Sequence, residues 1–369
     1  MLFPRTLARS IAAEVLIFTG IGFLAFIVIL LIQNLAQRLE ELVAVGMSFR
    51  DASAVVIHLV GMVSPYAVPV GFLFGVLAAV GRLSADSEVT AMRSCGLGLG
   101  AIFGPVIAIA TVLALLTALL MIRVEPEARK ELRSVLASVA SRGAIFTPGR
   151  FRTVGGRVLY IQSRDIDDES LLKRIFIADR TNPKRPFLIF AQSARFRFDP
   201  DQLLIHLEME NGDIHLESAD LSGHQRIAFE GFDYTLDASA LIDATRLLKP
   251  SEMDLSQLAD MMDRPLNPAL GRQPSQYRAH FHRRLAIPFA PFVFAALGVP
   301  LGLRRSRAAR SWGVLVCIAL VGGYYMLLGF GQFMGETGRM PAAIALWLPN
   351  LLFGLASIPL LRSAQRGMA

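Results

Sequence analysis

The feature that most constrains this chain is its long apolar segments, which form two groups of three with a polar stretch between them. Each segment has about 20 residues or more, which is enough to cross a bilayer as a helix. Hydrophobic residues make up 53% of the 369 residues and charged residues only 18%, a balance too apolar for a soluble globule. We therefore predict six transmembrane helices, at residues 11–32, 52–80, 101–122, 285–303, 311–333 and 341–361.

The polar stretch, residues 123–284, has the pattern of a β-domain between two short helices, one charged at 125–141 and one at 255–262. Apolar and polar residues alternate from Ile205 to Met209, as in a strand with one buried face. Gly155-Gly156 and Asn211-Gly212 predict tight hairpin turns. The sequence thus indicates an α-helical membrane protein with six transmembrane helices and an inserted all-β, jellyroll-like domain. Its domains are 1–122, 123–284 and 285–369.

Arginine residues in short loops predict the orientation of the chain. The N-terminal segment, the loops at 82–93 and 304–310 and the C-terminus lie on one side, and together they carry more arginine than the loops opposite. Such loops face the cytoplasm, so the β-domain is expected outside the cytoplasm, although the arginines at 278–284 oppose this assignment. The net charge of +7 reflects arginine flanking the spans rather than a nucleic-acid surface.

The loop at residues 81–100 has the pattern of a short helix on the membrane surface. Ser84 is a candidate N-cap, Asp86 and Glu88 fall in the first turn, and Gly96 can end the helix. The chain has no Walker motif, so if it moves a substrate, the energy is expected to come from a partner. Docking of that partner on this helix and a plain solvated loop are both compatible with the pattern.

The residue types of the chain do not indicate an enzyme, a metal site or a cofactor. His206 and His215 are expected to face each other across a hairpin, but no third ligand is evident. Cys95 and Cys317 form neither a disulfide framework nor a metal-ligand spacing. No ionisable residue lies near the middle of a span, where ion-coupled transporters carry one.

Three segments resemble a known family. They are GRLSADSEVTAMRSCG at 81–96, HRRLAIPFAPFVFAALGVPLGL at 282–303 and WLPN at 347–350. They are similar to the lipopolysaccharide-export permeases of the LptF/LptG (YjgP/YjgQ) family, and slightly more to its F-like members. The resemblance covers the whole chain. It implies a multi-pass protein of the bacterial inner membrane that works with a second permease, a dimeric LptB-like cytoplasmic ATPase and periplasmic LptC/LptA-like β-jellyroll proteins, and that exports lipopolysaccharide.

The resemblance also implies roles for particular residues. Residues 84–95 would form the coupling helix that sits in a groove of the ATPase, with contacts from Ser84, Asp86, Glu88 and Arg93. Glu88 would pair with a basic residue of that groove. The first span, with the fifth span of the partner permease, would form a lateral gate for the lipid, which would be contacted by Phe26, Ile29 and Arg38.

Two other functions are compatible with the residues. One is a membrane scaffold or sensor that transports nothing and binds an envelope partner through its β-domain. The other is an intramembrane enzyme, which is disfavoured because no span carries paired acids, a Ser/His pair or a His/Glu metal pattern.

Overall fold

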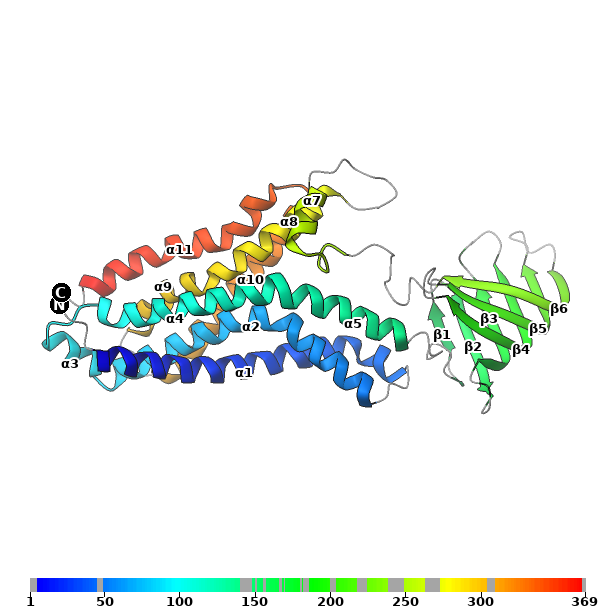
Figure 1. Ribbon diagram of the computed structural model, residues 1–369, viewed down its shortest axis with the longest axis horizontal. Helices are drawn as coiled ribbons and strands as arrows, with labels where there is room; N and C mark the ends of the chain where they lie inside the picture. The colour runs from blue at the N-terminus through cyan, green and yellow to red at the C-terminus, as the bar shows by residue number, and fades with distance from the viewer. Residues whose placement is uncertain are drawn as a thin grey trace. The chain divides into compact units, whose positions relative to one another are not determined.

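The computed structural model describes most of the chain, namely residues 5–44, 49–139, 148–149, 151–154, 157–165, 168, 170–179, 181, 186–199, 204–217, 224–237, 249–262, 273–303 and 309–366. Within them the chain divides into two compact units (Figure 1). One comprises residues 1–34, 58–129 and 249–369, and the other residues 35–57 and 130–248. The first is helical. The second contains the β-sheet.

Six helices are long and apolar enough to cross a membrane, which confirms the predicted number of spans. Short helices and turns among the described residues extend or connect them. In chain order the helices are α1 (Arg5–Ala44), α2 (Phe49–Ala85), α3 (Glu88–Ser94), α4 (Gly100–Leu119), the π-helix η1 (Leu120–Val124), α5 (Glu125–Val139), α7 (Leu255–Met262), α8 (Pro274–Ala286), the 3-10 turn η4 (Ile287–Phe289), α9 (Ala290–Gly302), α10 (Ala309–Glu336) and α11 (Ala342–Arg366).

The helices extend beyond the apolar segments that predicted them. At 1.5 Å per residue, α1 is about 60 Å long, roughly twice the hydrocarbon thickness of a bilayer. Pro65 and Pro69 lie inside the second span, and α2 continues through both of them. Helix α7 forms over the residues predicted for a short helix in the linker.

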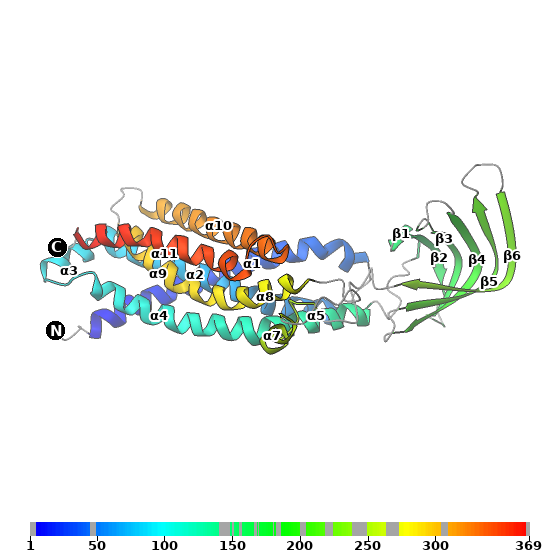
Figure 2. The ribbon, with the colours of Figure 1, turned by 90° about the horizontal axis from the view of Figure 1, so that it is seen from above.

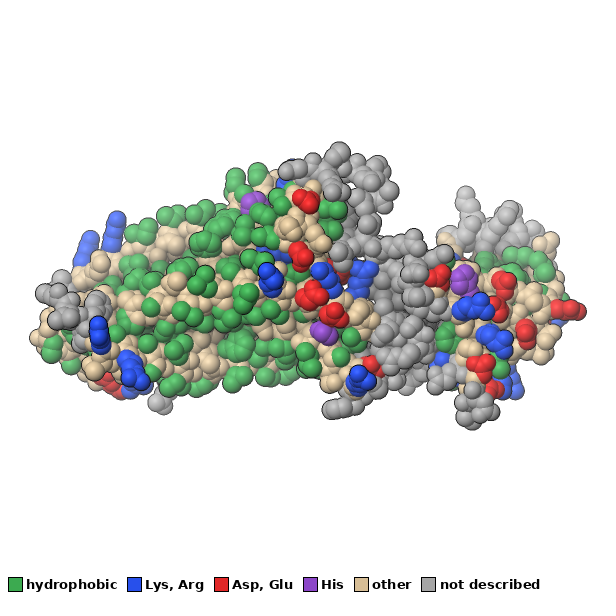
Figure 3. Space-filling view, in the orientation of Figure 1, with side chains coloured by type: hydrophobic (Ala, Val, Ile, Leu, Met, Phe, Trp, Pro, Cys, Tyr) green, Lys and Arg blue, Asp and Glu red, His purple; other side chains and the backbone are tan. Residues whose placement is uncertain are grey.

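Helices α2 and α9 form the centre of the helical unit, whereas only 22–28% of the residues in the most apolar parts of α1, α10 and α11 are buried. The core contains large apolar residues such as Phe72, Leu73 and Phe294, all fully buried. On the face shown in Figure 3, hydrophobic side chains cover the flanks of the helices, and charged side chains gather near the helix ends. This distribution is typical of helices that cross a lipid bilayer.

The β-unit is built on one antiparallel sheet of six strands in which every strand pairs with its neighbours in sequence. The pairing of Val154 with Arg157 confirms a two-residue connection at 155–156, residues that lie outside the described part of the chain. The inserted all-β domain is therefore confirmed. Its strands are β1 (Phe151–Val154), β2 (Arg157–Arg164), β3 (Leu171–Asp179), β4 (Phe187–Asp199), β5 (Leu204–Glu217) and β6 (His224–Asp237).

A row of positions that lack a ladder partner runs across this sheet from β2 to β6, and we call this row the crease. Each of four successive strand ladders omits one pair, and the omitted positions form a continuous row: Gln162, Arg174, Gln192, Asn211 and Glu230. Arg174 and Asn211 have left-handed backbone conformations there, with φ of 53° and 52°. Buried residues in β3 are three apart across the crease, at Leu172 and Ile175, instead of two. The crease thus keeps the same apolar face inward on both halves while the strands bend.

The bend brings together strands that are not neighbours in the sheet (Figure 2). Tyr234 on β6 donates a hydrogen bond to Asp179 on β3, with an O–O distance of 2.5 Å. Its ring also makes an edge contact with Phe187 on β4. The inner face is therefore an apolar interior with one polar cluster at Asp179.

Two predictions for this domain are wrong. Asn211-Gly212 is not a hairpin turn, because β5 runs without interruption from Leu204 to Glu217 and Asn211 lies at the crease. His206 and His215 consequently lie on the same strand and do not face each other; His206 is opposite Arg197 and Thr235. The positive φ that Asn tolerates serves here to bend a strand rather than to reverse the chain.

Candidate functional site

The candidate site is α3 and the end of α2 that carries it. Helix α3 packs one side onto the core of the helical unit through Val89 and Met92, which are both buried. It ends in a Schellman motif: the amide of Gly96 donates to the carbonyl of Arg93, and the amide of Leu97 to the carbonyl of Met92. Gly96 has the φ of +76° that this motif requires, which confirms its predicted role as the helix stop. The helix is thus short, has a defined C-terminal end and is held on the helical unit by its buried side.

The start of the helix differs from the prediction that Ser84 is its N-cap. Helix α2 continues to Ala85, and the residue before α3 is Ser87, in a left-handed conformation with φ of 60°. The Ser84 hydroxyl is buried and donates instead to the carbonyl of Leu303, at 3.2 Å, at the end of α9. Ser84 therefore fastens the end of α2 to α9.

Arg82 binds three carboxylates around this turn. Its guanidinium donates from two nitrogens to the two oxygens of Glu14 on α1, with Nη2 at 2.6 Å from Oε2. Its Nη1 lies 3.0 Å from Asp86 Oδ2 and 3.7 Å from Glu88 Oε1. The side chain of Glu14 is only 13% exposed, whereas those of Arg82, Asp86 and Glu88 are about half exposed. One arginine thus connects α1, the turn and α3.

The remaining residues expected to contact an ATPase lie on or beside α3. Asp86 and Glu88 flank Ser87. Glu88 is in the first turn of α3, as predicted, whereas Asp86 precedes the helix and does not lie in its first turn, contrary to the prediction. Arg93 is in the last turn and partly buried, and its Nε has no hydrogen-bond partner among the described residues. The structure therefore brings Asp86 and Glu88 together and places Arg93 at the other end of the helix.

The residues expected to contact lipid lie on α1. Ile29 is 58% exposed, on a face that also exposes Leu24, Val28 and Ile32. Phe26 is partly buried against Ile27, Val63 and Ala67, between α1 and α2. The side chain of Arg38 lies outside the described part of the chain. Ile29 is thus exposed on the outside of the helical unit, whereas Phe26 contributes to the packing between α1 and α2.

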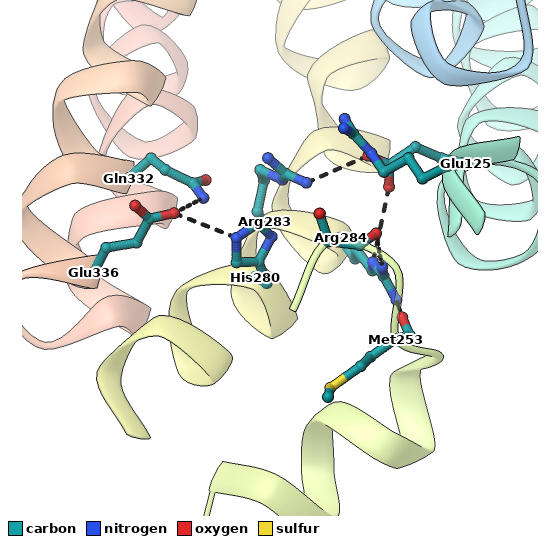
Figure 4. A network of polar contacts seen from close by, with 9 residues as sticks. Glu125, Met253, His280, Arg283, Arg284, Gln332 and Glu336 are labelled. Carbon is teal, nitrogen blue, oxygen red and sulfur yellow. Dashed lines mark hydrogen bonds and ion pairs between the residues drawn. The ribbon is translucent and has the colours of Figure 1, made fainter. Parts of the chain in front are cut away.

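A buried network of charged residues, the Glu125 network, lies where α5 and α8 meet (Figure 4). Glu125 is fully buried, and its Oε1 lies 2.6 Å from Arg129 Nε and 3.4 Å from Arg283 Nη2. Arg284, also fully buried, lies 3.9 Å from the other carboxylate oxygen and donates to the carbonyls of Met253 and Ser251. The network therefore fastens α5, α8 and the segment before α7 to one another.

A second polar cluster, also anchored on α8, reaches α10 (Figure 4). His280 Nε2 on α8 lies 3.3 Å from Glu336 Oε1, and Gln332 donates to the same oxygen at 2.5 Å. Sequence reasoning missed the Glu125 network because the predicted spans ended at residue 122 and began at residue 285. Charges just outside those limits looked solvated. The signal that could have found it is the helical spacing of Glu125 and Arg129, four residues apart.

Among the described residues of the β-unit, a polar cluster lies within the apolar inner face. Asp179 accepts hydrogen bonds from Thr181 and Tyr234, each at 2.5 Å, and pairs with Arg157 Nε at 2.8 Å. Burial by itself would raise the pKa of Asp179, but these donors outweigh it and lower the pKa to about 2. Burial and the neighbouring carboxylate raise the pKa of Tyr234. The cluster is thus a stable ionised contact between β2, β3 and β6.

Comparison with known proteins places this architecture in one family. The model of the lipopolysaccharide export system permeases LptF/LptG matches residues 9–363. The lipopolysaccharide export system permease protein LptF of Escherichia coli (strain K12) is 24% identical over 341 residues, covering 89% of this chain and 88% of that protein. The protein of the same name from Shigella flexneri matches to the same extent. The chain therefore belongs to the LptF/LptG family of lipopolysaccharide export permeases and is a multi-pass protein of the inner membrane.

Proposed function

We propose that this chain is a membrane subunit of an ATP-driven exporter that extracts lipopolysaccharide from the inner membrane and passes it to a periplasmic bridge. The observation that carries the proposal is α3, a short helix seated on the core through Val89 and Met92. Its N-terminal end presents Asp86 and Glu88, which are about half exposed. A rigid projection with an acidic end suits a groove lined with basic residues on a soluble partner.

In this proposal the partner on α3 is a homodimeric, LptB-like ATPase in the cytoplasm. Glu88 and Asp86 pair with its cations, Arg93 contacts it at the other end of the helix, and Ser84 holds the base of the helix on α9. The exposed apolar faces of α1 and α10 support a second permease of the same family, because one subunit leaves them uncovered. The β-unit lies in the periplasm, where it meets LptC/LptA-like β-jellyroll proteins.

The lipid path is proposed along α1. Ile29 lies on an exposed apolar face that acyl chains can cover, Phe26 borders it, and Arg38 is placed by sequence to meet a lipid phosphate. The creased sheet encloses a second apolar region, built from buried residues such as Ile177, Ile189 and Leu207, which would have to part to expose an apolar surface to acyl chains. Acyl chains need such a surface to leave the bilayer without exposure to water.

The docking of the ATPase is tested by charge reversal on α3. We expect Glu88→Lys to lower the amount of ATPase that co-purifies with the chain about tenfold or more, because reversing one charge of a docked ion pair costs upwards of about 1.4 kcal/mol. Asp260→Lys is the matched control, since Asp260 is an exposed acidic residue on α7. Native mass spectrometry of the purified complexes measures the retained ATPase. Equal retention in both variants would exclude Glu88 as a contact.

The lipid is tested on the same preparations. A photo-reactive amino acid in place of Ile29 should form an adduct with lipopolysaccharide, whereas one in place of Val15, which is fully buried on the same helix, should not. Adducts with phospholipid alone at position 29 would count against the lipid path.

A further inference from the structure

The connection from α3 to α1 through Arg82 is not explained by docking alone. A contact surface for an ATPase needs acidic residues on the outside of α3. It does not need a carboxylate on α1, the first span, that binds an arginine at the base of α3. Glu14 is such a carboxylate, and the two hydrogen bonds that it accepts from Arg82 span 68 residues of sequence.

The turn between α2 and α3 is held in one conformation by contacts on both sides of Ser87. Ser87 has a left-handed backbone, a conformation that non-glycine residues adopt only when neighbouring contacts hold it. Arg82 lies before this residue and contacts Asp86 on one side of it and Glu88 on the other. The guanidinium therefore resists rotation of α3 about Ser87.

Helix α1 is in turn held tightly against α2. A Cβ added to Gly75 would lie 2.2 Å from Thr19 Oγ1 and 2.7 Å from Thr19 N, and one added to Gly71 would lie 2.7 Å from Phe23 N. The two backbones thus meet without intervening side chains, as close helix contacts in membranes require. A force applied at Glu14 consequently acts on a span that is already in backbone contact with α2.

The charges around Arg82 are unbalanced. One guanidinium faces the three carboxylates of Glu14, Asp86 and Glu88, so the cluster carries an excess of negative charge. A cation on a docking partner is attracted to the exposed pair, Asp86 and Glu88, and competes with Arg82 for them. When it binds them, Arg82 keeps Glu14 as its remaining carboxylate, because Glu14 is the least exposed of the three and its bidentate pair is the closest.

We propose that Arg82 and Glu14 are positioning residues that transmit the docking and movement of α3 to the first span. This inference rests on the proposed function, since it assumes a partner that moves α3 with each cycle of ATP hydrolysis. It assigns a role to a contact between α1 and the base of α3, and it predicts that hydrolysis and lipid movement separate when the contact is removed.

The test uses the full complex of this chain with its partner permease and the ATPase, reconstituted in vesicles that contain lipopolysaccharide. Phosphate release and transfer of lipopolysaccharide to a soluble β-jellyroll acceptor are measured together. We expect Glu14→Gln to retain the ATPase and to lower the lipid transferred per ATP hydrolysed about fivefold or more, the lower end of typical couplings between sites. Glu14→Asp, which keeps the carboxylate, is expected to retain more of this ratio than Glu14→Gln.

The matched control is Arg9→Gln, which removes an exposed charge from the same helix. It should leave the ratio unchanged. If Glu14→Gln does not accumulate as folded protein, Arg82→Gln replaces it, because Arg82 is about half exposed and carries the same expectation for the ratio. A purely structural contact would lower the amount of complex without changing the lipid transferred per ATP.

The outcomes separate this inference from the proposed function. A wild-type chain that retains no ATPase overturns the proposed function, and the transmission role with it. A wild-type complex that transfers lipid, together with a Glu14→Gln complex that has the wild-type ratio, overturns the transmission role alone. A reduced ratio with the ATPase still bound supports both.

Discussion

Glu125→Gln is the substitution whose effect on stability follows most directly from the structure. It preserves the shape of a fully buried side chain and removes its charge. Arg129 lies 2.6 Å, Arg283 3.4 Å and Arg284 3.9 Å from the carboxylate. The change therefore leaves three guanidinium groups without the anion that they share, two of them at most 13% exposed.

The magnitude follows from the balance of attraction and desolvation. Two unit charges 4 Å apart interact by about 4 kcal/mol at an effective dielectric constant of about 20. Desolvation offsets part of this, and removing one partner of a buried pair costs about 3–5 kcal/mol in total. Because about 1 kcal/mol corresponds to only one or two degrees in a protein of this size, we expect the midpoint of thermal unfolding in detergent to fall by about 5 °C.

Glu127→Gln is the matched control, since Glu127 is an exposed residue of the same helix, and we expect it to change the stability by about 0.5 kcal/mol or less. In the Glu125→Gln background, Arg129→Gln should restore part of the loss because it removes one of the unpaired cations. Equal midpoints for Glu125→Gln and Glu127→Gln would refute the argument that the network stabilises the helical unit.

Two further predictions concern the α1–α2 contact and the β-unit. Gly75→Ala should destabilise the helical unit by about 2 kcal/mol or more, because the added methyl group collides with backbone on α1, whereas Gly20→Ala meets no atom within 4 Å and should not; detergent melting distinguishes them. Asp179, with its pKa lowered to about 2, contributes up to about 2 kcal/mol that is present above pH 4 and is lost as the pH falls from about 4 toward 2. Tyr234→Phe should shift this loss to higher pH, as measured by hydrogen exchange of β-unit peptides in the full chain; an unchanged pH profile would contradict it.

Much of the fold could be predicted because apolar length and alternation are local signals. The six spans, the helix at 255–262 and the end of α3 at Gly96 all depend on residues within a few positions of one another. Asn211-Gly212 shows where such signals fail. The same φ that closes a two-residue hairpin also bends a continuous strand, and the choice depends on Arg174 and the other crease positions in neighbouring strands.

The polar contacts that matter most could not be predicted for a related reason. Arg82 and Glu14 are 68 residues apart, and Arg283 and Glu125 are 158 apart, so no periodicity relates them. Each of these charges also lies at the edge of an apolar segment, where an isolated helix would expose it to water or lipid headgroups. Burial comes from the neighbouring helices, which extend beyond the apolar segments and enclose these positions. A charged residue at the end of a predicted span is therefore a candidate for a buried pair whenever a residue of opposite charge lies at the end of another span on the same side of the membrane.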